Sequence, residues 1–327
     1  MSNLKIDVIY VVYHYHNETI ESIKSLKKML SYCKIKSKVY VFDNSFNIVE
    51  KSEVKKFMSF IKESSSPNIS IEYTPSDKNL GFGSGCNYVF KKGISEKVLI
   101  TNCDTSFEKT NPEKFKKFFM ECNSSNVIIG PRIINENNLV HASCFSFDPI
   151  SIFFKPLRHV RHIGRITKFI PEYKAFKKRI DRITYEGLNK NQSSKVDWVS
   201  GCCFLIDRNF FANVGGFDER FFLYFEDVDL CRKAKQIGLN VIFYPSLSVI
   251  HKGRHESRNQ KGIFNSITKN IVARYHISSW LKYMFKWRRD FLYKLIFVLK
   301  RFSNKNNYLN KKGYFMDFSK FEPIKKK

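Results

Sequence analysis

Apolar runs and amphipathic segments alternate along the first hundred residues of the chain. Short runs rich in β-branched residues are typical of buried strands in a parallel sheet, and we expect strands at residues 6–13, 38–42, 69–73 and 97–101. Apolar residues three and four positions apart predict helices between them, at residues 18–30, 54–61 and 86–92. This order of strands and helices predicts an α/β fold with a doubly wound sheet.

The pattern is less regular after residue 110. We expect helices at residues 112–122, 209–214 and 227–238, and strands at residues 127–134, 196–207, 240–244 and 247–250. Residues 145–195 are basic and aromatic without clear periodicity, and we interpret them as an insertion over the functional edge of the sheet. The predicted organisation is therefore an α/β domain over residues 1–258 and a helical, basic and aromatic region over residues 259–327 with a mobile tail.

The net charge of the chain indicates which classes of binding partner to expect. The 327 residues include 57 Lys and Arg against 30 Asp and Glu, a formal net charge of +27. Such an excess favours an anionic partner: nucleic acid, an acidic membrane face or a phosphorylated substrate. The eight cysteines form no C-x-x-C pair, and we interpret them as reduced thiols of a cytoplasmic protein. No apolar run is long enough to span a bilayer, so any membrane association should be peripheral.

Acidic side chains mark the ends of two predicted strands. Asp43 follows the second strand and Asp104 follows the fourth. Ligands of open α/β sheets bind at this carboxyl edge. A dinucleotide fingerprint would need glycines directly after the first strand, which instead ends at Tyr13 and His14, so the sequence argues against a dehydrogenase.

A second acidic cluster lies further along the chain. Glu226, Asp227 and Asp229 fall within four residues, and His251 follows a predicted strand. Carboxylates this close resist joint ionisation unless a cation neutralises them, which favours a metal-assisted acid/base site. The alternative is a solvated helix start, where acidic residues are also favourable.

Several short blocks together resemble a known family. The blocks span residues 6–257 and are Asp43-Asn44-Ser45, Asn79-Leu80-Gly81-Phe82-Gly83 with Asn87, Asn102-Cys103-Asp104, Gly130-Pro131-Arg132, Asp197-Trp198 with Gly201, Gly215-Gly216-Phe217-Asp218, Glu226-Asp227-Val228-Asp229-Leu230, and His251. In this order they resemble family 2 glycosyltransferases of the GT-A fold, especially rhamnosyltransferase-like members. The resemblance implies an inverting, divalent-metal-dependent hexosyltransferase that uses a nucleoside diphosphate sugar.

The resemblance also implies a metal site. Asp104 occupies the position of the family's metal carboxylate, and His251 that of a third ligand found in some members. The usual Asp-x-Asp motif is Asn-x-Asp here, so Asn102 would offer a neutral oxygen to the metal or a donor to the ribose. The implied cofactor is Mg²⁺ or Mn²⁺. The alternative for His251 is a structural histidine.

Further residues are assigned to the donor and to catalysis by the same resemblance. Asp43 would contact the base or ribose, and Asn79 and the backbone at Gly81 would approach the nucleotide. Trp198 would shape the sugar pocket, although a Trp in the core is an equal alternative. Asp227 would be the general base, with Glu226 as the alternative base.

The expected partners follow from the family and the charge. The donor would be dTDP- or UDP-linked, with dTDP-rhamnose as the leading candidate, and the acceptor a lipopolysaccharide, O-antigen, capsule or lipid-linked glycan. The basic C-terminal region would bind the anionic inner face of the cytoplasmic membrane, or pack on the domain or in an oligomer. An inactive homologue serving as a scaffold is one alternative. A nucleic-acid-binding protein is another, but the sequence contains no recognisable binding module.

Overall fold

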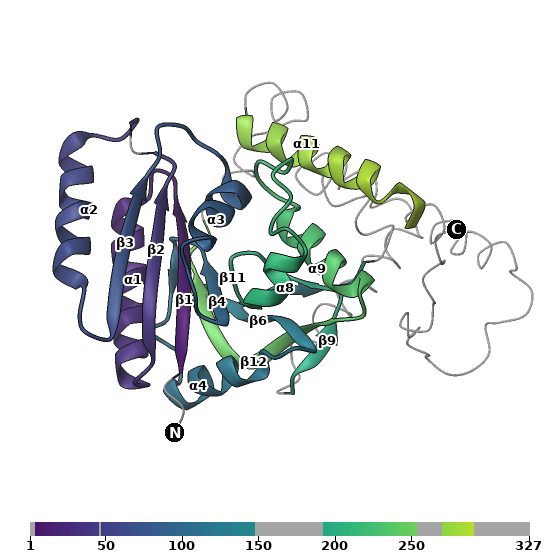
Figure 1. Cartoon of the computed structure of the whole chain (residues 1–327), viewed down its shortest axis with the longest axis horizontal. Coiled ribbons are helices and arrows are strands. Elements are labelled where there is room, and N and C mark those ends of the chain that lie inside the picture. The colour runs from purple at the N-terminus through teal and green to yellow at the C-terminus, as the bar shows by residue number, and fades with distance from the viewer. Residues whose placement is uncertain (1–3, 46, 148–191, 254–269, 291–327) are drawn as a thin grey trace, which may run out of the picture.

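A computed structural model describes residues 4–45, 47–147, 192–253 and 270–290 (Figure 1). Most of the predicted insertion and the predicted mobile tail lie outside these residues. Within the described residues, one sheet has the strand order β3-β2-β1-β4-β11-β6-β12-β5, with β7 paired to β6 and β9 paired to β12. Its strands are β1 (Lys5–Val12), β2 (Lys36–Asp43), β3 (Ile69–Pro75), β4 (Lys97–Thr101), β5 (Thr105–Ser106), β6 (Asn126–Ile134), β7 (Val140–His141), β9 (Ser194–Val196), β11 (Cys203–Asp207) and β12 (Asn240–His251).

The sheet is parallel at one side and mixed at the other. Strands β3, β2, β1 and β4 are parallel, as the alternation of strands and helices predicted. Strand β11 is antiparallel to both β4 and β6, whereas β12 runs parallel to β6. A separate antiparallel pair consists of β8 (Cys144–Phe145) and β10 (Trp198–Val199). The α/β fold is therefore confirmed, with a mixed sheet rather than a wholly parallel one.

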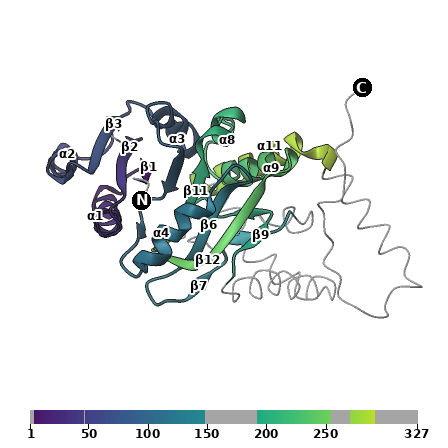
Figure 2. The same ribbon diagram turned by 60° about the horizontal axis from the view of Figure 1, so that its bottom comes forward.

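Helices cover both faces of the sheet (Figures 1 and 2). The helices are α1 (His16–Tyr32), α2 (Lys51–Ser64), α3 (Phe82–Phe90), α4 (Pro112–Glu121), α8 (Arg208–Asn213), α9 (Glu226–Gln236) and α11 (Ile271–Lys286). One hydrophobic core joins the sheet to α1, α2 and α4 through residues such as Ile23, Phe57 and Phe115. The other core joins it to α3, α8, α9 and α11 through residues such as Val89, Phe211 and Tyr283. Burial of both sheet faces explains why the central strands are apolar throughout.

The strands predicted at residues 196–207 and 240–250 have different boundaries in the structure, and each difference has a physical reason. The predicted strand at residues 196–207 is divided among β9, β10 and β11, because the chain bends at Asp197 and turns at Gly201 and Cys202. The two strands predicted at residues 240–250 form the single strand β12, with a shift of register between Tyr244 and Ser248. This irregularity accommodates Pro245, which cannot donate a ladder hydrogen bond.

Helix α11 comes from the region predicted to be separate from the α/β domain. Its buried side chains include Ala273, His276 and Tyr283, and Trp287 follows it in the same core as the sheet. The described part of the C-terminal region therefore packs on the α/β domain. No helix in the described part of the chain is long and apolar enough to cross a membrane.

Candidate active site at the carboxyl edge of the sheet

Asp104 follows β4, His251 is the last residue of β12, and their side chains meet at the carboxyl edge of the sheet. The Nε2 atom of His251 lies 3.2 Å from Oδ1 of Asp104, and both side chains are about one-fifth exposed, at 22% for His251 and 19% for Asp104. The backbone N–H of Gly253 donates to Oδ2 of Asp104 at 3.2 Å. Burial opposes ionisation of Asp104, but His251 and this N–H hold the pKa of the carboxyl below its usual range. The two predicted metal ligands are therefore adjacent and open to solvent.

Buried hydroxyl groups support the turn that carries Asp104. The Thr105 hydroxyl donates to the backbone carbonyl of Asn102 at 2.8 Å. It also lies 2.9 Å from the hydroxyl of Thr101 and 3.1 Å from that of Ser22. Because Thr105 pairs with His251 between β5 and β12, this network connects the Asn-x-Asp turn to the histidine. Asn102 itself is half-buried at the turn.

The glycine-rich turn closes onto the start of α3. The side chain of Asn79 accepts a hydrogen bond from the N–H of Gly81 at 2.9 Å, and Asn44 holds the same turn through Leu80 and Gly81. Gly81 has φ +83°, and a Cβ atom there would collide with the carbonyl oxygen of Phe222. Only glycine suits this position, so the backbone path of the predicted donor loop depends on it.

Asp43 supports the site from within the protein. Its side chain is fully buried and accepts hydrogen bonds from His16, Tyr73 and both the N–H and hydroxyl of Ser45, at 2.6–2.8 Å. Burial opposes its charge, but these bonds hold the pKa of Asp43 below its usual range. A donor contact through this carboxylate stays a prediction, and in the structure both oxygens already have partners within the protein.

Asp227 and Glu226 lie in the first turn of α9. The Oδ2 atom of Asp227 accepts from the N–H of Gly201 at 2.8 Å, and Oδ1 accepts from the N–H of Val228 at 2.8 Å. Asp227 is half-buried, whereas Glu226 is buried at 6% exposure. Of the two candidate bases, Asp227 is therefore the more accessible to an acceptor.

The carboxylates of the acidic cluster do not converge. Asp229 is fully buried and pairs with Lys286 at 2.7 Å, while the Trp287 indole N–H donates to it at 2.8 Å. In the described residues no group of three His, Cys, Asp or Glu side chains is arranged to hold a metal ion. Asp229 is thus neutralised by the ammonium group of a lysine, and the metal-assisted acid/base role of the other two carboxylates stays a prediction.

Trp198 is a core residue rather than an exposed stacking platform. Its side chain is only 5% exposed, and its ring stacks on Phe145 with centroids 3.9 Å apart and an interplanar angle of 14°. The pairing of β10 with β8 fixes this arrangement. The structure therefore supports the core alternative for Trp198 that the sequence left open.

The sequence did not predict several residues that are distant in the chain and form hydrogen bonds or ion pairs with residues of the site. His16, Lys286 and Trp287 bond to Asp43 or Asp229, and Asn87 binds the backbone of Phe217 through both ends of its amide. Asn87 belonged to one of the blocks that carried the family resemblance. For His16, Lys286 and Trp287, nothing in the surrounding sequence indicated a partner elsewhere in the chain.

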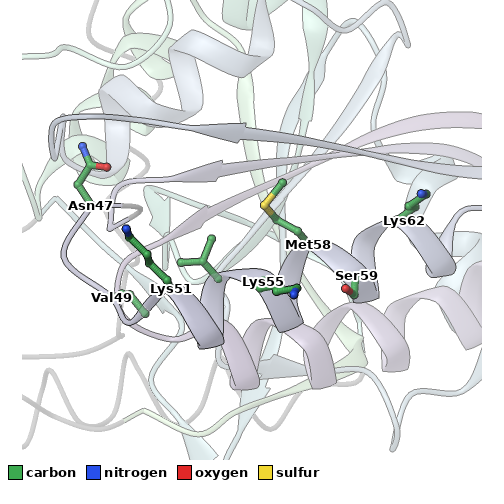
Figure 3. A pocket seen from close by; sticks show the side chains of 8 residues that line it. Asn47, Val49, Lys51, Lys55, Met58, Ser59 and Lys62 are labelled. Atoms are coloured by element: carbon green, nitrogen blue, oxygen red, sulfur yellow. The ribbon is translucent and has the colours of Figure 1, made fainter.

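A surface cavity of about 640 Å³ lies elsewhere, beside α2 and the loop that precedes it (Figure 3). It is lined by Asn47, Val49, Lys51, Val54, Lys55, Met58, Ser59 and Lys62. None of the predicted site residues lines this cavity.

Known proteins that resemble the chain are glycosyltransferases. It is 45% identical over 62 residues to an N-acetylglucosaminyl-diphospho-decaprenol L-rhamnosyltransferase of Mycobacterium tuberculosis, covering 19% of this chain and 20% of that one. It is 30% identical over 110 residues to the rhamnosyltransferase WbbL of Escherichia coli, covering 31% and 39%. It is 24% identical over 249 residues to the hexosyltransferase Agl10 of Haloferax volcanii, covering 75% and 67%. The first two matches thus span less than half of those relatives.

The fold has a solved counterpart. A crystal structure of GalNAc-T7 with UDP, GalNAc and Mn²⁺ superposes with a TM-score of 0.52 at 13% identity, covering 76% of this chain and 44% of the other. No family model matches the chain. Together, the named relatives and the GT-A fold confirm the resemblance to rhamnosyltransferase-like family 2 glycosyltransferases that the sequence predicted.

Proposed function

We propose that the protein is an inverting glycosyltransferase that moves a hexosyl or rhamnosyl group from a nucleoside diphosphate sugar to a glycan or lipid-linked acceptor. The observation that carries this proposal is the solvent-accessible pair of Asp104 and His251 at the sheet edge, with the carboxylate of Asp227 in the first turn of α9. The rhamnosyl- and hexosyltransferase relatives support the same class of reaction.

Asp104 and His251 fit a divalent cation. One carboxylate and one imidazole suit Mn²⁺ well and Mg²⁺ adequately, with diphosphate and water oxygens completing the shell. When bound, the cation would neutralise charge on the departing diphosphate. Asn102 lies two residues from Asp104 and offers a neutral amide to the donor ribose.

Asp227 would act as the general base. The acceptor hydroxyl loses its proton to this carboxylate as its oxygen attacks the anomeric carbon. The bond from that carbon to the diphosphate oxygen breaks, and the nucleoside diphosphate leaves with the electron pair. The Gly201 N–H fixes one oxygen of Asp227, which orients the carboxylate for this transfer. Glu226 is the alternative base, although it is more deeply buried.

The proposed donor and acceptor follow the relatives' names. A rhamnosyl donor such as dTDP-rhamnose is the leading candidate, with UDP-hexoses and UDP-galactofuranose as alternatives. The mycobacterial relative is named for a diphospho-decaprenol acceptor, so a polyprenyl-diphosphate-linked precursor of lipopolysaccharide, O-antigen or capsule is the proposed acceptor class.

The outer face of α11 suits the anionic membrane that would carry such an acceptor. Ile271, Leu281 and Phe285 are 52–69% exposed there, Arg274 of the same helix is also exposed, and so is Arg289 just beyond the end of α11. Cations near the surface attract acidic lipid headgroups at about 1 kcal/mol each, and exposed apolar side chains beside them insert at the boundary between headgroups and acyl chains. Co-sedimentation with phosphatidylglycerol vesicles should fall for Phe285→Ser, while binding to phosphatidylcholine vesicles should be weak for both proteins.

The proposal is tested by transfer from a panel of nucleotide sugars. Purified protein is incubated with each donor, a polyprenyl-diphospho-N-acetylglucosamine acceptor and Mn²⁺, and both nucleoside diphosphate release and sugar incorporation are measured. We expect one donor to support transfer and Asp104→Ala to abolish most of it. Asp290→Asn is a matched control, because Asp290 is 45% exposed and pairs only loosely with Arg232 at 3.6 Å. Undiminished transfer by Asp104→Ala would contradict the proposed site.

A further inference from the structure

The buried face of α11 contacts the turn that leads into α9. The ring of Phe225 lies 5.3 Å from that of Tyr283 and 5.4 Å from that of His276. The ring of Tyr224 lies 4.8 Å from His276, and the Ser279 hydroxyl donates to the carbonyl of Leu223 at 2.9 Å. Three consecutive residues before Glu226 are therefore in contact with one helix from the far end of the chain.

That turn has an unusual backbone. Tyr224 and Phe225 have φ values of +69° and +68°, in the left-handed region that bulky side chains rarely occupy. Such conformations persist only where the surrounding structure over-determines them, and they are concentrated at functional sites. Because Phe225 is the residue directly before α9, the left-handed turn sets the direction in which Glu226 and Asp227 leave the loop.

A buried ion pair also connects α9 to α11, at Asp229, two residues after Asp227. Asp229 is fully buried, and Lys286 places its ammonium group 2.7 Å from both Asp229 and Asp218. The indole N–H of Trp287 donates to Asp229 at 2.8 Å. Lys233 is more distant from Asp229, at 3.9 Å. A buried carboxylate that loses its closest cation is strongly destabilised, so Lys286 is the main anchor of this contact.

We infer that helix α11 is a positioning element of the catalytic centre, and that Lys286 holds the first turn of α9 so that Asp227 faces the acceptor. The inference rests on the proposed function, because it assumes that Asp227 is the base. It extends that function by making a helix outside the predicted catalytic domain necessary for the orientation of the base. Lys286 is a positioning residue, since it contacts Asp229 and not the reacting atoms.

The test combines kinetics with amide hydrogen exchange of the full chain. Lys286→Met keeps the aliphatic stem and removes the charge, whereas Lys286→Arg retains a cation. Misplacement of a reacting group by about 1 Å costs about 100-fold in rate. We therefore expect Lys286→Met to lower kcat about 10- to 100-fold with little change in the KM for the donor, and Lys286→Arg to recover part of kcat.

Exchange at Gly201 reports the carboxylate directly and needs no substrate, because its N–H donates to Asp227. We expect exchange there to accelerate on the order of tenfold in Lys286→Met. Lys282→Met is the matched control: it lies one turn away on α11, and its exposed amine contacts the backbone carbonyl of Arg220. It should leave both kcat and this exchange unchanged.

The outcomes separate the two proposals. Wild-type kcat together with unchanged exchange at Gly201 in Lys286→Met would overturn the positioning role, whatever the donor. A wild-type protein that transfers no sugar would contradict the proposed function, while faster exchange in Lys286→Met alone would still support the positioning of Asp227 by α11.

Discussion

Gly201 offers the most selective way to disturb Asp227 without removing it. A Cβ atom at position 201 would lie 3.0 Å from both Cβ and Oδ2 of Asp227 and 3.2 Å from its Cγ. Ordinary contacts between carbon atoms are about 3.5–4.0 Å, so Gly201→Ala should push the carboxylate by about half an ångström. Gly201 has no left-handed backbone, so alanine adds no conformational strain of its own.

The magnitude follows from the sensitivity of catalysis to position. If a displacement of about 1 Å costs about 100-fold, half that displacement should lower kcat about tenfold, or about 1.4 kcal/mol in the activation free energy. Steady-state transfer assays would measure kcat and KM, and thermal denaturation would measure stability. We expect kcat to fall while the melting temperature and the donor KM change little.

Gly215→Ala is the control, because we expect it to lower stability and leave kcat unchanged. Gly215 has φ +73°, and the space that a Cβ atom would take there is open. Alanine at this position should therefore cost about 1 kcal/mol of stability through backbone strain without touching Asp227. Wild-type kcat in Gly201→Ala would refute the reasoning, because the base would then tolerate displacement or lie elsewhere.

Three further changes test the structural parts of the site. Gly81→Ala should destabilise the protein by more than about 1 kcal/mol and weaken donor binding, because the new methyl group meets the Phe222 carbonyl at a left-handed position; thermal denaturation with and without nucleotide would measure both effects. Asp43 has a lowered pKa in the folded chain, so the stability it provides is present above its unfolded pKa of about 4 and is lost as the pH falls through the folded value; Asp43→Asn should be less stable at pH 7 and show a weaker acid dependence in urea denaturation. Trp198→Ala should cost about 3–5 kcal/mol by removing a buried ring stacked on Phe145, whereas Trp198→Phe should retain most of the stability, and equal stability of both variants would contradict the core role.

Local pattern predicted the parallel half of the sheet well. The fourth strand was placed at residues 97–101, as found for β4, and the first three differ from β1, β2 and β3 by one or two residues at their ends. Most residues of β1, β2 and β4 are buried, so these strands are mainly apolar in sequence, and the edge strand β3 is short, rich in β-branched residues and only partly buried. Strand β11 could be predicted as a strand but not as antiparallel, because its direction depends on which neighbours it joins.

The sequence predicted those parts of the site that depend on neighbouring residues or on strand ends, but not the contacts between residues distant in the chain. The proximity of Asp104 to His251 follows from two strand ends meeting at one sheet edge, which topology rules anticipate. The partner of Asp229 lies 57 residues away on a helix that the charge pattern assigned to a separate region. Trp198 illustrates the same limit, since exposure of a single aromatic residue depends on tertiary packing that sequence periodicity does not encode.

The most direct test of the account compares transfer by the wild-type protein with transfer by Asp227→Asn, using the active donor and Mn²⁺. Asparagine retains the shape and cannot accept the proton, so we predict a loss of roughly 10²- to 10⁴-fold in kcat, which is what a general base contributes, with an unchanged thermal shift by the nucleoside diphosphate. Transfer at the wild-type rate by Asp227→Asn, with donor binding intact, would contradict the assignment of this centre.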